Sequence, residues 1–473
     1  MQVFKLKDYK TKDTIVALST YPAKSAIGLI RISGEKALKI LSKIFFSKAI
    51  KDFKNIKSHK LYYGFIIDRK KGSNYKIIDE VLVAVMKKPN SYTKEDVVEI
   101  NCHGGLLVID KIVKLICKYG ARLALPGEFT YRAFLHGRLD LLQAKSVVDI
   151  IEAKSEEALD IAIRQLEGEQ SKKLNSIKSN LEDLFSHLEA YINFPDEEIC
   201  LDKRSLKGRL IKVKKEISSI IQASIDTKKY QDGINCVICG KTNVGKSTLF
   251  NRLLKEERAI TSSIAGTTRD VIGETTNLDG LTLKIFDTAG VFKTIDALSE
   301  KAIEKTEETF KKSDIILLVL DGSKAIEDDD YFFLNKLSAL KLEDKKIIFV
   351  INKIDLEQKL TISNNFKKLG PIVRISALKN IGIEKLQNTI KKLVYKKGIN
   401  LKNSFILNAY QLEILKNLRK KIEDVINFLE KNYTIDFVIL ALKEAIEDLG
   451  KLAGEIVSED ILKDIFSKFC IGK

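Results

Sequence analysis

The sequence predicts a multidomain α/β protein with an α+β amino-terminal domain, an α-helical central domain, and a doubly wound, mainly parallel α/β domain inserted into the helical one. Its 473 residues exceed the ~250–300 residues that one hydrophobic core usually serves. The hydrophobic period changes twice along the chain, and similar helical patterns flank the inserted stretch. The expected domains are 1–122, 123–230, 231–393 and 394–473, the second and fourth being the two parts of the helical domain.

The amino-terminal domain is predicted from short runs rich in Val and Ile that Gly, Pro and Asn separate. Such runs are typical of strands, and their irregular spacing suits an α+β arrangement. They cover residues 14–18, 27–32, 61–67, 80–86 and 97–101.

The helical domain is predicted from apolar residues that recur at steps of three and four, which places them on one face of a helix. The first such helix should stop before Pro195, because proline cannot continue it. The seam residues are Leu174, Ile177, Leu181, Leu184, Leu188 and Tyr191 in the first part, and Leu415, Leu418, Ile422, Val425 and Leu429 in the second.

The inserted domain is predicted from strand-like runs that alternate with helical stretches. This alternation is typical of a doubly wound sheet with most strands parallel. The runs cover residues 234–239, 281–286, 315–320, 346–351 and 371–375.

The net charge of +17 favours an anionic partner such as nucleic acid. Lys and Ile are abundant throughout, so a general compositional bias explains the charge equally well. No stretch approaches the ~18 apolar residues of a spanning helix, and residues 1–10 lack a secretory pattern. A cytoplasmic location without membrane attachment is therefore expected.

The cysteines form no disulfide framework. Cys236 and Cys239 make a CxxC pair, but they stand in the apolar run 234–240. We expect burial in a strand rather than redox or metal chemistry.

A phosphate-binding loop is predicted at 240–247, Gly-Lys-Thr-Asn-Val-Gly-Lys-Ser, because the motif follows a strand and precedes an amphipathic helix. The glycines let backbone N–H groups turn toward phosphates at the positive end of the helix. Lys246 should reach the β- and γ-phosphates, and the Ser247 hydroxyl should bind Mg²⁺.

Three further motifs follow in the order expected of a GTP site. Asp287 opens Asp-Thr-Ala-Gly and should hold Mg²⁺ through water, while Gly290 donates its N–H to the γ-phosphate. Thr268 is the expected switch threonine. Asp355, in Asn-Lys-Ile-Asp, can accept two hydrogen bonds from guanine that adenine cannot donate.

The expected GTP contacts therefore come from four segments, and Lys246, Thr268, Gly290 and Glu300 are the expected catalytic residues. The contacts are Asn243, Val244, Gly245, Lys246, Ser247 and Thr248; Ser262, Ser263, Ile264, Ala265, Gly266, Thr267 and Thr268; Asp287, Thr288, Ala289 and Gly290; and Asn352, Lys353, Asp355, Ser376, Ala377 and Leu378.

Hydrolysis needs a group that positions water and a cation that offsets the developing charge. Many small GTPases place a glutamine where this chain has Val291. A binding-only GTP switch therefore stays an alternative on these residues alone.

The chain resembles the family of tRNA-modifying GTPases MnmE (TrmE) nearly from end to end. The resemblance rests on Asn243 in the phosphate loop, on the loop 261–270, and on the terminal Phe-Cys-Ile-Gly-Lys at 469–473. Motifs at 13–17, 28–34, 99–105 and 125–129 extend it through the amino-terminal domain.

This resemblance implies a folate-binding amino-terminal domain, a Ras-like GTPase domain, a homodimer, and a heterotetramer with the FAD-dependent enzyme MnmG. The pair would add an aminomethyl or carboxymethylaminomethyl group at C5 of the wobble uridine in certain tRNAs. It also implies K⁺ bound by Asn243, Ser262, Ile264 and Thr267, in the role that an arginine finger has elsewhere.

For 5-formyltetrahydrofolate or a related one-carbon folate, the resemblance implies Arg31, Glu99, Arg138 and Lys473. Cys470 is expected to be a structural or substrate-proximal thiol, and the alternative is a nucleophile, which would need a lowered pKa. Two positions depart from the family pattern. Ser299 stands where a water-positioning glutamate is expected, so the adjacent Glu300 is the candidate, and residues 407–411 lack the usual basic residues and histidine.

Two rival functions are weaker. A ribosome-assembly GTPase would carry an RNA-binding GxxG loop, and none follows Asp355. A membrane-anchored switch would use Cys470 for prenylation, but Lys473 is a poor last residue for that signal.

Overall fold

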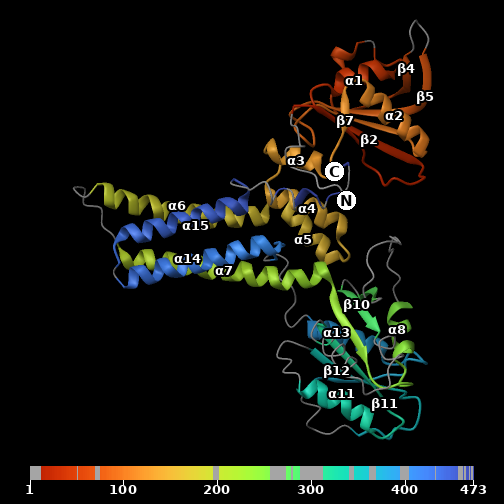
Figure 1. Cartoon of the computed structure of the whole chain (residues 1–473), viewed down its shortest axis with the longest axis vertical. Helices are drawn as coiled ribbons and strands as arrows, with labels where there is room; N and C mark the ends of the chain where they lie inside the picture. Colours follow the sequence, from red (N-terminus) through yellow and green to blue (C-terminus); the bar gives the residue numbers. More distant parts are fainter. Residues whose placement is uncertain are drawn as a thin grey trace. The chain divides into compact units, whose positions relative to one another are not determined.

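The computed structural model describes residues 12–50, 52–69, 75–194, 202–255, 273–278, 281–287, 310, 313–339, 346–361, 369–394, 404–431, 433–455, 462, 465–467, 469 and 472–473. Two compact units divide the chain (Figure 1). The first comprises residues 1–151, 162–217 and 408–473, and the second comprises residues 152–161 and 218–407.

The first unit contains a seven-stranded sheet in the order β3-β4-β5-β6-β2-β1-β7. β7 pairs parallel with β1, and the other neighbours are antiparallel. The five predicted runs are all strands, whereas the short β3 and β7 were not predicted. The strands are β1 (Thr14–Leu18), β2 (Ile27–Ser33), β3 (Phe45–Phe46), β4 (Lys60–Arg69), β5 (Tyr75–Met86), β6 (Val97–His103) and β7 (Ala121–Leu123).

Helices α1 (Ala37–Ile44) and α2 (Leu106–Lys118) pack on one face of this sheet and form a core with it. Strand alternation decides which side chains enter that core. In β2, Ile30 and Ile32 are fully buried, while Arg31 between them points to the opposite face. That opposite face leaves large apolar side chains exposed on β4 and β5.

The helical part of the first unit is built on α6 (Glu169–Asn193), α7 (Lys203–Asp232, whose residues from 218 on lie in the second unit), α14 (Ala409–Glu430) and α15 (Ile435–Ala453). α15 packs against both α6 and α14, and ion pairs join α7 to α14. The predicted seams are buried except for Tyr191, which is 36% exposed. The α6 helix ends two residues before Pro195, as predicted.

Two segments far apart in sequence therefore form one helical domain, as the matching patterns indicated. A capping box between Asn408 and Gln411 begins α14 directly after the inserted domain. Three shorter helices, α3 (Glu128–Leu135), α4 (Leu141–Glu152) and α5 (Glu156–Leu166), lie between the sheet and α6 along the chain.

The second unit contains a six-stranded sheet in the order β13-β12-β11-β8-β10-β9. All neighbours are parallel except the pair of β9 and β10, so the prediction of a mainly parallel sheet is confirmed. The strands are β8 (Ile234–Cys239), β9 (Gly273–Leu278), β10 (Leu281–Asp287), β11 (Ile315–Asp321), β12 (Lys346–Asn352) and β13 (Ile372–Arg374).

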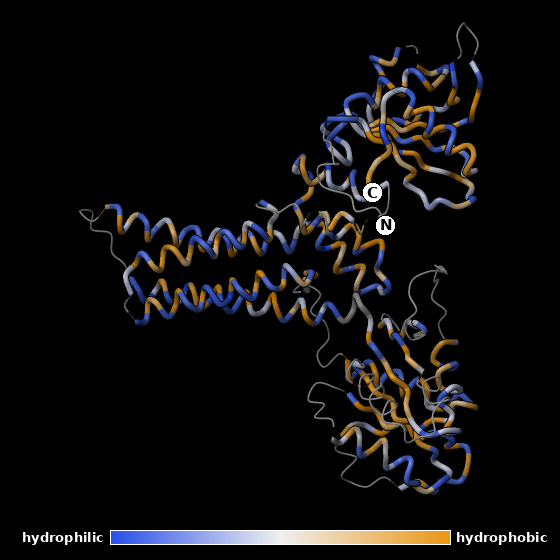
Figure 2. Tube along the Cα trace, in the orientation of Figure 1, coloured by the Kyte–Doolittle hydropathy of each residue, from blue (hydrophilic) through white to orange (hydrophobic). Residues whose placement is uncertain are grey.

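Helices cover both faces of this sheet, with α8 (Lys246–Lys255) and α13 (Ile383–Val394) on one face and α11 (Asp328–Ala339) on the other. The apolar strands run through the middle of the domain in Figure 2. Cys236 and Cys239 lie in the cores of opposite faces. Burial raises the pKa of Cys236 to about 12 and raises that of Cys239 as well, and the predicted burial in a strand is confirmed.

In the part of the chain that the structure describes, no helix has the length and apolar character needed to cross a membrane. Within the same residues, no three His, Cys, Asp or Glu side chains gather as metal ligands.

Candidate functional site

The phosphate loop between β8 and α8 contains three residues with positive φ, a backbone conformation that favours glycine and asparagine. Gly240 has φ +139°, and a Cβ there would lie 2.3 Å from the Val319 carbonyl oxygen. Gly245 has φ +98°, and a Cβ there would lie 2.2 Å from an Asn352 nitrogen. Asn243 is left-handed at φ 62°, which asparagine tolerates better than most residues. The loop therefore turns its backbone inward as the motif predicted.

Lys246 is almost fully buried at the centre of this loop. Its ammonium donates hydrogen bonds to the carbonyl oxygens of Gly240, at 2.8 Å, and Lys241, at 2.6 Å. Ser247 and Thr248 follow it on the first turn of α8 and are exposed. The cation thus sits where the loop and the helix amino terminus would both meet a phosphate.

Asn352 joins three of the predicted motifs. Its side-chain amide donates to the Val244 carbonyl at 2.8 Å, and its side-chain oxygen accepts from the Ala377 N–H at 2.9 Å. Both bonds are buried. Asn352 therefore ties the phosphate loop to the segment that contacts the base, a role that its motif did not reveal.

Asp355 lies at the base end of the same site. Hydrogen bonding by Ser376 is the largest cause that lowers the pKa of Asp355, and the charge of Lys379 contributes. The carboxylate is therefore ionised at neutral pH and can accept two donors from guanine. Arg252 of α8 holds this end in place by donating to the carbonyls of Ala377, at 3.0 Å, and Leu378, at 2.8 Å. Sequence reasoning missed Arg252.

Lys353 is also fixed, with φ 65° and an ion pair of 2.6 Å to Asp321. Burial raises the pKa of Asp321, but hydrogen bonds from Lys353 and Ser323 outweigh it and lower that pKa. A cavity of about 600 Å³ lies between the phosphate loop, residues 352–356, and Ser376 with Leu378. The predicted phosphate and base residues thus line one cavity.

The predicted switch residues lie outside the described residues. They are Ser262, Ser263, Ile264, Ala265, Gly266, Thr267, Thr268, Thr288, Ala289, Gly290, Val291, Ser299 and Glu300. Asp287 is the last residue of β10, which agrees with its predicted place at a strand end. Cys470 is likewise outside the described residues.

A second cluster brings together residues of the amino-terminal sheet. Arg31 of β2 and Glu99 of β6 are cross-strand neighbours and form an ion pair of 2.8 Å. The Arg31 guanidinium lies 5.5 Å from the ring centre of Tyr92, and that of Arg138 lies 4.7 Å from the same ring. Two of the four predicted folate residues, Arg31 and Arg138, therefore lie over one tyrosine ring, and a third, Glu99, is bonded to Arg31.

The terminal motif docks on this cluster within the same chain. The Gly472 carbonyl accepts from the Ser19 hydroxyl at 3.1 Å and from Arg31 at 3.3 Å. The Phe129 N–H donates to the Lys473 carbonyl at 3.2 Å. Gly472 has φ +96°, and a Cβ there would lie 2.3 Å from the Leu18 carbonyl oxygen. The predicted proximity of Lys473 to the amino-terminal domain is confirmed.

Apolar residues before the tail anchor it. Leu462, Ile465, Phe466 and Phe469 are buried against α3 and α4, as the apolar run predicted, while Ile461 lies outside the described residues. Phe466 meets Tyr131 of α3 edge-on, with ring centres 5.2 Å apart.

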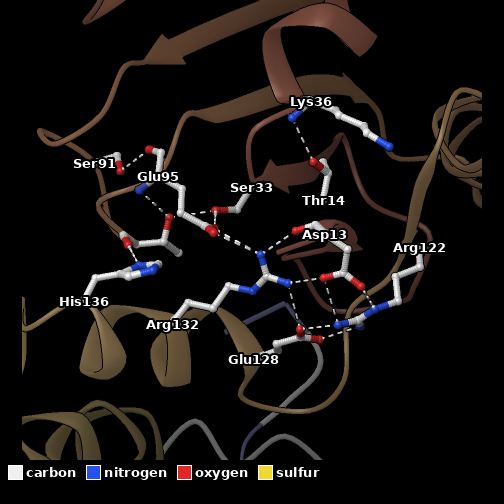
Figure 3. Close-up of polar contacts among 11 residues, drawn as sticks. Asp13, Thr14, Ser33, Lys36, Ser91, Glu95, Arg122, Glu128, Arg132 and His136 are labelled. Atoms are coloured by element: carbon white, nitrogen blue, oxygen red, sulfur yellow. Dashed lines mark hydrogen bonds and ion pairs between the residues drawn. The ribbon is translucent and has the colours of Figure 1, made fainter. Parts of the chain in front are cut away.

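A largely buried ionic network ties α3 to Asp13, Glu95 and Arg122 (Figure 3). Arg132 donates to a carboxylate oxygen of Asp13 at 2.7 Å and of Glu128 at 3.1 Å. Arg122 binds the same two carboxylates, each at 2.6 Å. Glu95 accepts from Arg132 at 3.1 Å and from the Ser33 hydroxyl at 2.6 Å.

This network has a consequence for the tail. Glu128 and Arg132 flank Phe129, whose N–H holds Lys473 and whose ring centre lies 5.6 Å from the Arg31 guanidinium. The network therefore positions the helix turn that connects the tail to Arg31. Because its partners are separated by up to 119 residues, no local pattern predicted it.

The chain matches known families over both domains of its first unit and through the inserted domain. The model described as the MnmE helical domain matches residues 141–470, and the model described as the GTP-binding protein TrmE N-terminus matches residues 14–138. The tRNA modification GTPase MnmE of Thermoanaerobacter pseudethanolicus is 43% identical over 465 residues, which cover 98% of this chain and 99% of that protein. Proteins of the same name from Clostridioides difficile, at 43%, and Alkaliphilus oremlandii, at 40%, have the same coverage.

Proposed function

The chain belongs to the MnmE family of tRNA modification GTPases, and on that premise we propose that it installs an aminomethyl or carboxymethylaminomethyl group at C5 of the wobble uridine in certain tRNAs. Family membership makes it a GTPase that acts in tRNA modification. It also favours this function over a ribosome-assembly GTPase and over a binding-only switch. The proposed partner is an FAD-dependent subunit of the MnmG type, in a cytoplasmic heterotetramer.

In the GTP site, the described residues would bind and orient the nucleotide. The inward-turned loop and the Lys246 ammonium would neutralise phosphate charge, and the ionised Asp355 would select guanine. Ser247, Thr268 and Asp287 would hold Mg²⁺, which supplies charge neutralisation between the phosphates. Asn243, Ser262, Ile264 and Thr267 would hold K⁺. Asn243 is the one of these four proposed K⁺ ligands that lies within the described residues, and it lines the cavity with a left-handed backbone conformation.

At the second cluster we place a one-carbon folate such as 5-formyltetrahydrofolate. The side chains fit its chemistry, because Arg31 and Arg138 offer cations to carboxylate and carbonyl groups, and Tyr92 offers an aromatic face. Glu99 can accept hydrogen bonds from the paired donors of a pterin ring. Lys473 would add a cation from the docked tail, and Cys470 would lie near the substrate or serve a structural role. The observation that carries the proposal is the docking of Gly472 against Arg31.

A second copy of the chain is the proposed cover for the exposed sheet face. Leu61, Tyr63 and Leu82 are 65%, 55% and 45% exposed there, and Tyr63 lies directly across from Leu82. Arg31 and Glu99 lie on the same face, so a homodimer would also enclose the folate cluster. Tyr63→Glu should give a monomer in analytical ultracentrifugation, whereas Leu356→Glu, a change at an exposed leucine of the other unit, should not. A dimeric Tyr63→Glu protein would contradict this interface.

Reconstitution tests the function. Purified chain, the FAD-dependent partner, GTP, a one-carbon folate and unmodified tRNA should together yield a C5-modified wobble uridine, measured by mass spectrometry of the digested nucleosides. Omission of folate or of GTP should abolish the product. Full product without added folate, from protein shown to carry none, would overturn the folate assignment.

A further inference from the structure

The α7 helix carries a concentration of positive charge that the GTP and folate sites do not use. Seven of the thirteen residues 203–215 are Lys or Arg and none is acidic. By contrast, α15 carries Asp436, Glu444, Glu447 and Asp448 against two lysines. Positive charge is therefore concentrated in this part of α7 rather than spread evenly over the helices, and a general compositional bias does not explain that difference.

The side chains of this segment divide into two sets. Leu206, Leu210, Val213 and Ile217 are buried in the helical domain. Lys207 and Lys214 form ion pairs with Glu430 and Glu423 of α14, at 2.7 and 2.9 Å. Arg209 donates a hydrogen bond to a backbone carbonyl of α6. These contacts hold the helices together.

The second set faces away from the domain. Arg204, Lys212 and Lys215 are exposed, and among the described residues none of them has an ion-pair partner. Helix geometry places them on the side opposite the buried residues, in a row about 16 Å long.

The neighbouring helix lengthens this row. The two ion pairs set an antiparallel register between α7 and α14, which lie side by side in Figure 1. In that register Lys416, Arg419 and Lys420 of α14 lie farther along the helix axis than Lys215 and so extend the row. All three are exposed. We call these six cations the basic strip.

Gly208 is a second, independent feature of the strip. It lies one helical turn from both Arg204 and Lys212, inside a helix, where glycine is destabilising relative to alanine. A Cβ at Gly208 would meet no heavy atom within 4 Å, so the packing of this chain does not require glycine. A residue without a side chain is useful where the backbone of a ligand approaches closely.

From this arrangement we infer that the basic strip of α7 and α14 binds the sugar–phosphate backbone of the tRNA substrate. Exposed Lys and Arg side chains in a row can neutralise successive phosphates. A protein partner is a poorer fit, because lysine is depleted in protein–protein interfaces. The inference rests on the family's action on tRNA and is independent of the folate site.

The test compares two triple variants of the full chain. Arg204→Gln, Lys212→Gln and Lys215→Gln together should weaken tRNA binding about tenfold or more at 0.15 M salt and reduce the slope of log K against log salt by about 2. The control changes three exposed lysines elsewhere, Lys39→Gln, Lys111→Gln and Lys443→Gln, and removes the same charge. It should keep the wild-type slope. Equal slopes and affinities for the two triple variants would overturn the inference.

Two further measurements separate the alternatives. GTP hydrolysis and 5-formyltetrahydrofolate binding should be unchanged in the strip variant, so a failure here is distinct from a failure of the proposed function. Gly208→Ala should raise Tm yet weaken tRNA binding, and unchanged binding would contradict the close approach. Loss of binding to the FAD-dependent subunit with unchanged tRNA affinity would identify a protein-docking surface and overturn the proposal.

Discussion

Gly472→Ala should release the terminal motif from the amino-terminal domain and with it the affinity for folate. At φ +96°, an alanine carries left-handed backbone strain of about 1–2 kcal/mol. Its Cβ would also lie 2.3 Å from the Leu18 carbonyl and 2.8 Å from the Ser19 Cα. Both neighbours are backbone atoms at the carboxyl end of β1, an interior strand of the sheet, so the tail has to move.

The movement breaks the three hydrogen bonds that hold the tail, from Ser19, Arg31 and the Phe129 N–H. Two neutral bonds and one charged bond together contribute about 2.5–6 kcal/mol. A loss of this size lowers the population of the docked tail by a factor on the order of 10²–10⁴. Apparent folate affinity falls with the fraction of molecules whose tail is docked, so we expect Kd to rise on the order of 100-fold.

Isothermal titration calorimetry with 5-formyltetrahydrofolate measures this change, and GTP turnover in K⁺ checks that the inserted domain is intact. Gly120→Ala is the matched control, because Gly120 has φ +104° and no heavy atom within 4 Å of an added Cβ. It carries the strain without the collision and should keep the wild-type Kd. A Gly472→Ala protein that binds folate normally would refute the docking argument.

Four further outcomes follow from the described contacts. Lys246→Ala should reduce GTP turnover roughly 100-fold or more, because the phosphates lose their buried cation, and retained turnover would place the phosphate site elsewhere. Asp355→Asn should weaken GTP binding at least ~100-fold and shift preference toward xanthine nucleotides in competition assays, while unchanged affinity would contradict the base contact. Arg132→Met should lower the free energy of unfolding by about 3–5 kcal/mol in urea titrations, because it leaves Glu128 and Asp13 under-neutralised, whereas the exposed Arg138→Met should change it little. Burial raises the pKa of Asp13, but Arg122 and Arg132 lower it below 3.8 overall. The stabilising contribution of Asp13 should therefore be present above pH 3.8 and be lost as pH falls through the lowered pKa. If the loss of stability in acid is the same in Arg132→Met as in the wild type, this pairing is contradicted.

The strands and helices with strong periodicity were predictable because one face of each is buried. All five predicted strands of the amino-terminal sheet exist, and β1 matches its predicted range. Strand β9, Gly-Glu-Thr-Thr-Asn-Leu, gave no signal, because its residues are mostly polar and it pairs antiparallel at a sheet edge. The short β3 and β7 depend on their neighbours rather than on their own sequence.

The candidate sites divide in the same way. Lys246, Asn352 and Asp355 belong to motifs with fixed spacing, and the tail was placed by its apolar residues. Arg252 and the network of Asp13, Arg122, Glu128 and Arg132 depend on contacts between segments that only the fold brings together. The cross-strand register that pairs Arg31 with Glu99 likewise follows from the sheet order and not from local composition.

Mass spectrometry of wobble nucleosides from a strain that lacks this gene tests the central claim most directly. The strain should lack C5-modified wobble uridine, and the wild-type chain should restore it. A chain without residues 470–473 should fail to restore it while its intrinsic GTP hydrolysis stays nearly normal. Normal modification in the deletion strain, or full restoration by the truncated chain, would contradict the account.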